Sequence, residues 1–477
     1  MKPKLLLPWL VAALSACTIG PDYRRPETSA PAAWRAGTAP ASESADAVWW
    51  EQFQDAALTS LVRAALANNK DLEIATARVD QAFAQYGITR SALFPQVDAD
   101  ASAGRQRSSL NGPIPVVPGR ATLNDYQVAL SASFEIDVWG RLRRASEAAR
   151  AGVLASEEGR RTVVLTLVSA VANGYIQLCA LDRQLEIARQ TSQSLGEAAR
   201  LQRVRFEGGA VPESDYRQAE SQYETAAAQV PELERLVARQ ENFISVLLGA
   251  NPGPIARGRT IDALLFPALP SGLPADLLER RPDIRQAEQN LVAANADIGV
   301  AKAAYFPRIS LTALLGIESG ELSNLFKGPS RTWSYGAGVS LPIFNGGRVR
   351  NQVAQAEALQ REALSSYRQS VIFAFQDVEN ALVDRAKFAQ TREVQARNVA
   401  ALQRFRDLAA LRYREGATLY IEVARAEESL FSAQLAYVAT QSQLFQSYAN
   451  LYKAMGGGWI AEAEKLAQQT SSTGGSP

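Results

Sequence analysis

The sequence predicts an α+β membrane protein in which very long helices continue a partial β-barrel. Three observations indicate this: the chain is an internal duplication, each half contains strands that alternate between apolar and small or polar residues, and each half contains a helical segment far longer than a globular helix. Four strands cannot close a barrel in a membrane, since the smallest transmembrane barrels use eight. Three copies of the chain would supply a trimeric 12-stranded β-barrel.

The composition disfavours the commonest enzyme classes. The 477 residues include 50 Lys+Arg, 49 Asp+Glu, two Cys and no His. The lack of His excludes Ser-His-Asp and Cys-His nucleophiles and the usual His-bearing zinc sites. A net charge of +1 argues against a nucleic-acid partner, which requires a basic surplus. We therefore expect no catalytic residues, no cofactor and no bound metal.

The N-terminus has the features of a secretory signal, predicted over residues 1–16. Two lysines precede a short apolar stretch, which ends in small residues directly before Cys17. The quartet Leu14–Cys17 resembles the bacterial lipoprotein signal, in which the Cys is acylated and becomes the first residue of the mature chain. The alternative is a plain signal peptide with an incidental Cys17. Thr18 in place of Asp implies, by the same resemblance, a location in the outer membrane.

The remaining segments near the two termini have the composition of irregular connecting chain. Residues 17–56 are rich in Pro, Ala and Ser, and we expect them to form an extended, lipid-anchored tether. Residues 461–477 end in a polar run that we expect to be a disordered tail. No segment after the signal contains 18 consecutive apolar residues, so no transmembrane helix is expected. Cys179 lies among apolar helical positions and is expected to be a buried, inert thiol.

The two halves of the chain match at fixed offsets of 212 and then 207 residues. The matched pairs include Asp71/Asp283, Phe94/Phe306, Gly140/Gly347, Gly209/Gly416 and Gly249/Gly456. We therefore expect structurally equivalent repeats over 57–250 and 282–460, joined by a linker with an equatorial region over 251–281. Each repeat is predicted to contain a helix, two strands, a long helix, a turn and a return helix.

Alternation with a period of two marks the strands. Even positions from Tyr126 to Val138 are apolar, and so are odd positions from Trp333 to Ile343. Shorter alternating runs lie at 97–103 and 309–317. The longer runs reach the length of about 9–11 residues that a tilted membrane-spanning strand needs, and aromatic residues gather near the strand ends. The alternative is a half-buried sheet in a soluble protein.

Two acidic residues lie on the polar side of the second strand, near the helix that follows. If the strand spans a membrane, Glu135 and Asp137 line the barrel lumen and favour cations. The alternative is ordinary solvated polarity.

Each half also contains one very long helical segment. Residues Arg141–Arg205 and Arg348–Arg414 contain no Pro and are dominated by Ala, Gln, Glu, Arg and Leu. A helix of that length spans about 100 Å, far more than a globular helix. Each segment ends at Gly, which supplies a left-handed cap, and a return helix follows, interrupted in the first repeat at Pro231. In a lipid-anchored barrel the two hairpin tips would lie deep in the periplasm.

Several segments together carry a family resemblance: the Cys17 start, the duplicated halves, EIDVWGR at 135–141, LPIFNGGR at 341–348 and LYKAMGGGW at 451–459. On these residues the mature chain resembles the TolC-type outer-membrane efflux channels, in particular the lipoprotein branch typified by OprM. The resemblance implies a homotrimer with a 12-stranded barrel in outer-membrane lipid and a long α-helical, coiled-coil-like periplasmic tunnel. It further implies an exit duct that works with a periplasmic adaptor protein and an inner-membrane pump, and exports drugs or other small molecules without chemistry of its own.

The resemblance also assigns a periplasmic gate just after the second hairpin turn. The matching residues are Ile421, Glu422 and Arg425, and Asp215 is the first-repeat counterpart of Glu422. Arg425 stands where many members have Asp, which departs from an all-carboxylate cation ring. The alternative is that Glu422 and Arg425 form an ordinary i,i+3 pair on the helix surface. The expected adaptor-docking tips are Gly208, Gly209, Ala210, Val211, Gly416, Ala417 and Thr418.

Two other functions stay open at this level. Long helices alone would also suit a lipid-anchored periplasmic coiled-coil adaptor or scaffold with a small soluble sheet. A periplasmic hydrolase with a His-free mechanism is a third possibility, although the Asp, Glu and Ser residues follow helical surfaces. Only the channel is expected to fractionate with outer membranes and to conduct ions as a trimer.

Overall fold

The computed structural model describes residues 18–28, 31, 33–35, 48–111, 121–269, 276–456 and 459–463. The predicted signal peptide, Cys17, parts of the predicted tether and residues 464–477 of the predicted tail lie outside the described residues. The described part divides into two compact units. The first contains residues 18–27, 78–111, 121–156 and 286–368 and holds the sheet; the second contains the remaining described residues and the main apolar core.

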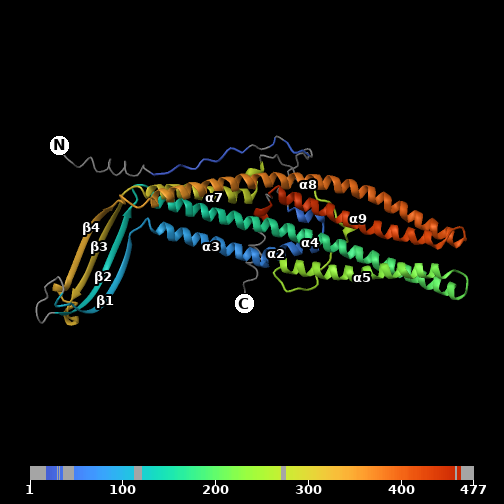
Figure 1. Cartoon of the computed structure of the whole chain (residues 1–477), viewed down its shortest axis with the longest axis horizontal. Coiled ribbons are helices and arrows are strands. Elements are labelled where there is room, and N and C mark those ends of the chain that lie inside the picture. The colour runs from blue at the N-terminus through green and yellow to red at the C-terminus, as the bar shows by residue number, and fades with distance from the viewer. Residues whose placement is uncertain are drawn as a thin grey trace. The chain divides into compact units, whose positions relative to one another are not determined.

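Each half of the chain contains the predicted series of a helix, two strands, a long helix and a return helix (Figure 1). In the first half these are α3 (Lys70–Ser91), β1 (Gln96–Arg107), β2 (Thr122–Ile136), α4 (Arg141–Glu207) and α5 (Glu213–Leu247). In the second half they are α7 (Pro282–Ala303), β3 (Arg308–Ser319), β4 (Arg331–Ser340), α8 (Arg348–Arg414) and α9 (Tyr420–Ala454). The shorter helices are η3 (Trp49–Phe53), α2 (Ala56–Asn68), η4 (Ile261–Ala263), α6 (Leu277–Arg280), η6 (Leu322–Asn324) and η7 (Gly328–Ser330).

The four strands form one antiparallel sheet in the order β1-β2-β3-β4. In the first hairpin Gln96 pairs with Ser133, and in the second Arg308 pairs with Ser340. These pairs are related by the same offsets of 212 and 207 residues that relate the two halves of the sequence. Both hairpins therefore have the same register, and the strands predicted from the alternation are confirmed.

The second strand of each hairpin ends earlier than the alternation predicts. β2 ends at Ile136 because the carboxylate of Asp137 turns to the start of α4, where it accepts the Leu142 N–H at 3.0 Å and the next N–H at 2.9 Å. β4 ends at Ser340, two residues before Pro342, which has no N–H for a strand ladder. In both cases the local chemistry of the turn ends the strand before the hydrophobic pattern does.

The long helices α4 and α8 each contain 67 residues, which corresponds to about 100 Å of helix. Each is followed by a Gly in the left-handed conformation, Gly209 with φ 73° and Gly416 with φ 72°. The N–H of Gly209 donates to the Phe206 carbonyl at 2.9 Å, and the following N–H donates to the Arg205 carbonyl at 2.8 Å. In the second turn the N–H of Gly416 donates to the Tyr413 carbonyl at 3.1 Å, and the following N–H donates to the Arg412 carbonyl at 2.8 Å. The predicted left-handed caps are thus confirmed as Schellman motifs.

The predicted interruption of the first return helix at Pro231 is wrong. α5 runs without a break from Glu213 to Leu247 and contains this proline. Pro231 removes only the hydrogen bond to the Ala227 carbonyl, and its ring is exposed. Leu233, two residues further on, is buried against a cluster on α4, and Val230, directly before the proline, packs against the same cluster. Packing on both sides of the proline therefore keeps the helix continuous.

The core of the second unit is built around aromatic residues from both ends of the chain. Trp49, Trp50 and Trp459 are fully buried, and Trp49 stacks on Tyr452 with ring centroids 5.4 Å apart. The end of the predicted tether therefore forms the buried 3-10 helix η3 rather than an extended connection. Removing these large apolar rings from water stabilises the folded chain. α4 contributes to the same core. It contains a stretch apolar enough to cross a bilayer, but 72% of that stretch is buried, which is typical of a core helix.

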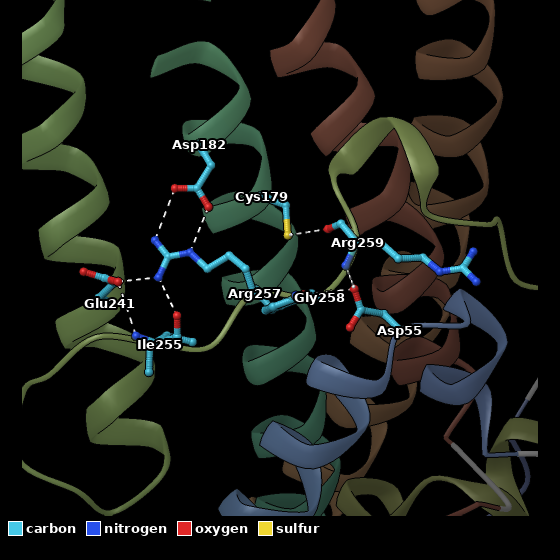
Figure 2. A network of polar contacts seen from close by, with 9 residues as sticks. Asp55, Cys179, Asp182, Glu241, Ile255, Arg257, Gly258 and Arg259 are labelled. Carbon is cyan, nitrogen blue, oxygen red and sulfur yellow. Dashed lines mark hydrogen bonds and ion pairs between the residues drawn. The ribbon is translucent and has the colours of Figure 1, made fainter. Parts of the chain in front are cut away.

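A network of polar contacts fixes the segment between the repeats to this core (Figure 2). Asp55 is 2% exposed. One of its oxygens caps α2, accepting the N–H groups of Ala57 at 2.8 Å and Leu58 at 3.1 Å. The other oxygen accepts the Tyr175 hydroxyl at 2.9 Å and the Arg259 N–H at 2.7 Å. The sharing of one carboxylate among α2, α4 and the linker satisfies its buried oxygens.

Arg257 and Cys179 complete the network (Figure 2). The Arg257 guanidinium donates to the two carboxylate oxygens of Asp182 at 2.9 and 3.2 Å and also contacts Glu241. The Cys179 thiol is 4% exposed and lies 3.8 Å from the Arg259 carbonyl oxygen. Burial raises the pKa of this thiol to about 12. The prediction that Cys179 is buried is confirmed, and the high pKa keeps it in the unreactive thiol form at neutral pH.

Candidate transport channel

The sheet has one apolar face and one polar face. Its register pairs Leu130 with Leu315 on the first face and Ser133 with Thr312 on the second. The apolar face is bare in a single chain, where Leu130 is 50%, Leu315 62% and Tyr335 80% exposed. An apolar surface of this kind is stable only against lipid or another protein surface.

Both edges of the sheet are open in a single chain. Every residue of β1 is exposed, as is nearly every residue of β4. The four strands contain 12, 15, 12 and 10 residues, which meets the need of a tilted membrane-spanning strand for about 9–11. An open edge cannot face lipid, because its N–H and C=O groups would have no partner there. The sheet is therefore one part of a barrel that strands from other chains complete.

The two acidic residues predicted to line the lumen lie at the end of the polar face, and both are paired. Glu135 and Arg141 form a bidentate ion pair with N–O distances of 3.0 and 2.8 Å. Asp137, besides capping α4, accepts from the Arg143 side chain at 3.3 Å. Each acid thus joins the end of β2 to the start of α4. Their exposure to a lumen stays a prediction, and the arginine partners reduce the negative charge that they would present to passing ions.

A groove of about 1150 Å³ continues from the polar face along α7 and α8. Glu135, Ser310 and Ser340 line it at the end of the sheet, and Asp297 and Glu362 line it along the helices. Many of its other lining residues are Ala. Small side chains and charges of both signs suit a wet passage better than a tight binding pocket, which would be mainly apolar.

The two hairpin turns are open to solvent in a single chain. The exposed residues are Gly208, Gly209, Ala210, Gly416 and Ala417, and the half-buried residues are Val211 and Thr418. The Schellman bonds described above fix the backbone of both turns. Both tips are therefore held by backbone hydrogen bonds and are accessible in a single chain.

The predicted gate residues lie at the start of α9. Glu422 accepts from the Arg412 side chain at 3.0 Å and also from the Thr418 hydroxyl. Arg425 is exposed and forms no hydrogen bond or ion pair with any residue that the structure describes. The alternative of an i,i+3 pair between Glu422 and Arg425 is therefore not what the structure shows. Ile421 is 38% exposed beside them.

A second cluster near the same turn was missed by the sequence analysis. Gln202 of α4 is 2% exposed and donates to the Tyr413 hydroxyl of α8 at 2.8 Å. Tyr420 of α9 packs edge-on against Tyr413 with ring centroids 5.4 Å apart, and burial raises its pKa to about 12. Asp215, the predicted first-repeat gate residue, is half-buried at the start of α5. No local spacing could reveal the bond between Gln202 and Tyr413, since its partners lie 211 residues apart.

The chain matches the family model for outer membrane efflux proteins over residues 61–250 and 273–457. A toluene efflux pump outer membrane protein of Pseudomonas putida, TtgC, is 36% identical over 98% of both chains. The cation efflux system protein CusC of Escherichia coli is 35% identical over 96% of this chain and all of the relative.

Solved structures match with similar coverage. The outer membrane channel CmeC of Campylobacter jejuni superposes with a TM-score of 0.87 at 28% identity, covering 95% of this chain and 98% of the other. The open state of the MtrE outer membrane channel of Neisseria gonorrhoeae superposes with a TM-score of 0.83 at 31% identity, covering 93% and 99%. The similarity extends over both halves of the chain in sequence and in fold.

Proposed function

The chain belongs to the outer membrane efflux protein family, and from this premise we propose that three copies, each anchored through an acylated Cys17, form the exit duct of a tripartite pump. The duct passes small molecules through the outer membrane. An inner-membrane pump supplies the energy and a periplasmic adaptor joins the two. No step in this function needs chemistry by the chain itself.

One observation carries the proposal: a sheet with a bare apolar face, a polar opposite face and two open edges. The barrel closes only in the trimer, where three sheets of four strands give twelve strands. Closure removes every open edge, places the apolar face against lipid and leaves the polar face around a water-filled bore. A water-soluble scaffold protein would not leave such an apolar face uncovered.

The substrates that we propose are small organic molecules. The names of similar proteins refer to toluene, antibiotics and cations. The groove beside the sheet is lined by small residues and by charges of both signs, which supports a passage without strong preference for one cargo. Selection among substrates is then left to the pump.

We place the periplasmic gate at Ile421, Glu422 and Arg425, with Asp215 as the first-repeat counterpart. In the closed duct three copies of these residues surround the constriction. Arg425 has no partner among the described residues of its own chain, so it is free to pair with Glu422 of a neighbouring copy. Arg412 and Thr418 hold Glu422 at the first turn of α9, which positions its carboxylate for that pair.

We place adaptor docking at the two hairpin tips, which are exposed and rigidly capped. Adaptor contact at the tips would act on the adjacent turn of α9, where the gate residues begin. Docking and opening are in this way coupled through a few residues.

Conductance in planar bilayers tests both the duct and its gate. The wild-type protein is expected to form channels of low conductance. Glu422→Ala combined with Arg425→Ala is expected to raise the conductance severalfold, because the ion pairs that close the constriction are lost. Glu428→Ala, at an exposed site on the same helix, is the control and should leave conductance at the wild-type value. Unchanged conductance in the double variant would remove the gate assignment, and a lack of conductance in every variant would refute the duct.

A further inference from the structure

The internal duplication provides a template for a contact that a single chain does not contain. The hairpins β1-β2 and β3-β4 have the same register once the offsets of 212 and 207 residues are applied. The sheet is therefore one hairpin repeated, and the pairing of β2 with β3 is the contact between successive hairpins. In a closed ring of hairpins, the pairing of β4 with β1 of the next copy is the same kind of contact.

We propose that the seam between copies repeats the register of β2 and β3. This inference rests on the proposed trimeric duct and deepens it by naming the residues that meet. Ala132 pairs with Ala313 inside the chain; their counterparts are Val339 and Ala101, so Val339 lies opposite Ala101 of the next copy. By the same rule Ser340 lies opposite Asp100 of the next copy.

The side-chain pattern limits the registers that the seam can adopt. In the proposed seam Val339, largely exposed in one chain, shares the lipid face with Ala101 of the next copy, and Tyr335 lies opposite Arg105, two residues before β1 ends. Ser340 shares the polar face with Asp100. A slip of one residue is excluded, because it would set lipid-facing residues of one strand opposite bore-facing residues of the other. A slip of two residues keeps the faces matched, so the equivalence of the two repeats selects the register among these.

A charged group at the seam also lacks its partner in a single chain. In the first repeat Glu135 pairs with Arg141 in bidentate geometry. Their counterparts 207 residues later are Pro342 and Arg348, and Arg348 forms no ion pair with any residue that the structure describes. In the proposed register Asp98 of the next copy lies opposite Pro342, where it supplies the missing carboxylate.

The turn after β4 also differs from its first-repeat counterpart, because its apolar side chains are not covered within a single chain. In the first repeat Trp139 packs on Phe306 with ring centroids 4.8 Å apart and donates to the Pro307 carbonyl at 2.8 Å. In the second repeat Gly346 replaces this Trp, while Ile343 is 95% and Phe344 92% exposed. The first-repeat counterpart of the Phe306–Pro307 surface is Phe94–Pro95. On the next copy it is the surface that these apolar side chains cover.

Disulfide cross-linking in the full-length membrane protein tests the register. Val339→Cys combined with Ala101→Cys is expected to give a covalent trimer on a non-reducing gel after mild oxidation. Val339→Cys with Ala103→Cys, and with Ala99→Cys, should not, because diagonal neighbours lie about 7–8 Å apart and a disulfide needs β-carbons within about 4.5 Å. Ala132→Cys with Ala313→Cys is the matched control, since the same geometry closes inside one chain. The native Cys179 is buried and does not interfere.

The outcomes separate the register from the duct. A covalent trimer only with Ala101→Cys supports the seam. A covalent trimer with Ala103→Cys or Ala99→Cys instead, or none with any seam pair while the intrachain control closes in a trimeric protein, overturns the register and leaves the duct intact. A monomer by native mass, with only the intrachain pair closing, overturns the seam and the duct together.

Charge exchange tests the ion pair. Asp98→Arg and Arg348→Glu are each expected to speed dissociation of the trimer in detergent, by about two- to fivefold if the pair has the value usual for a solvated ion pair. The combination of both is expected to restore the wild-type rate. Arg331→Glu combined with Asp98→Arg is the control, because Arg331 is also an exposed arginine but lies at the opposite end of β4. Rescue by Arg331→Glu, or no rescue by Arg348→Glu, contradicts the pairing.

Discussion

Asp137 and Glu135 show what a sequence pattern can and cannot reveal about a single residue. The alternation places both on the polar side of a strand, and the register keeps Glu135 there, opposite Ser310. The partners of these acids, Arg141 and Arg143, depend on the turn between β2 and α4. Periodicity alone therefore identified the face, while the geometry of the turn decided how much charge remains on it.

Glu158 is a buried acid whose protonation affects stability. It is 5% exposed and contacts Arg161 and Arg285, each at 2.8 Å. Burial raises its pKa above the ordinary value, although both arginines lower it. A raised folded-state pKa gives a stabilising contribution that is present below the unfolded pKa and lost as pH rises through the folded value.

Glu158→Gln should therefore show a pH-dependent effect on thermal unfolding. Gln resembles the protonated acid and does not ionise. The difference in melting temperature between the variant and the wild type should therefore shift in favour of the variant, by about 2 °C, when the pH is raised from 4.5 to 7.5. Glu157→Gln, at the neighbouring half-buried position, controls for the loss of one charge. A difference that falls with rising pH would show that the ion pairs outweigh burial.

At the scale of elements, the two repeats use the same joint with different chemistry. Where α3 begins, the Asn69 side chain donates to the Leu247 carbonyl at the end of α5 at 2.9 Å. At the equivalent place in the second repeat, Arg281 donates to the Ala454 carbonyl at the end of α9 at 3.1 Å. The sequence predicted matching repeats but not this joint, because its partners are brought together only when the return helix comes back.

Arg281 also contacts two carboxylates, Asp283 at 2.6 Å and Asp377 at 3.0 Å. Burial opposes its charge, but the two acids outweigh burial and raise its pKa. Arg281→Ala should lower the free energy of unfolding by about 2 kcal/mol, since it leaves the buried Ala454 carbonyl without this donor and removes ion pairs to two partly exposed carboxylates. Arg281→Asn copies the first joint and should recover part of the loss, as measured by chemical denaturation of the solubilised protein. Equal losses in both variants would mean that the backbone bond contributes little.

Pro231 offers a gain in stability. Its ring removes one hydrogen bond from an otherwise continuous α5, and a proline in a helix interior costs about 3 kcal/mol relative to Ala. Pro231→Ala should raise the free energy of unfolding by about 2 kcal/mol, because the wild-type proline also restricts the unfolded chain. Gln229→Ala, at an exposed position of the same helix, should change it by much less. A loss of stability in Pro231→Ala would indicate that the proline shapes a contact in the trimer.

At the scale of the whole molecule, the sequence predicted the duplication, the strands, the long helices and their glycine caps, since each is set by a repeating local pattern. It misjudged α5 at Pro231 and the buried aromatic helix at Trp49. Both depend on contacts between segments far apart in the chain. The scaffold alternative required a sheet covered by its own polypeptide, whereas within the described residues its apolar face and both edges are bare.

The most direct test of the duct is to ask which face of the sheet surrounds the bore. Ser131→Cys and Leu130→Cys are adjacent positions on β2 with opposite orientations. A charged, membrane-impermeant thiol reagent added to channels in a planar bilayer should reduce the conductance of Ser131→Cys and leave Leu130→Cys unchanged. Block of Leu130→Cys alone, or no effect on Ser131→Cys in a conducting channel, would contradict a bore lined by the polar face.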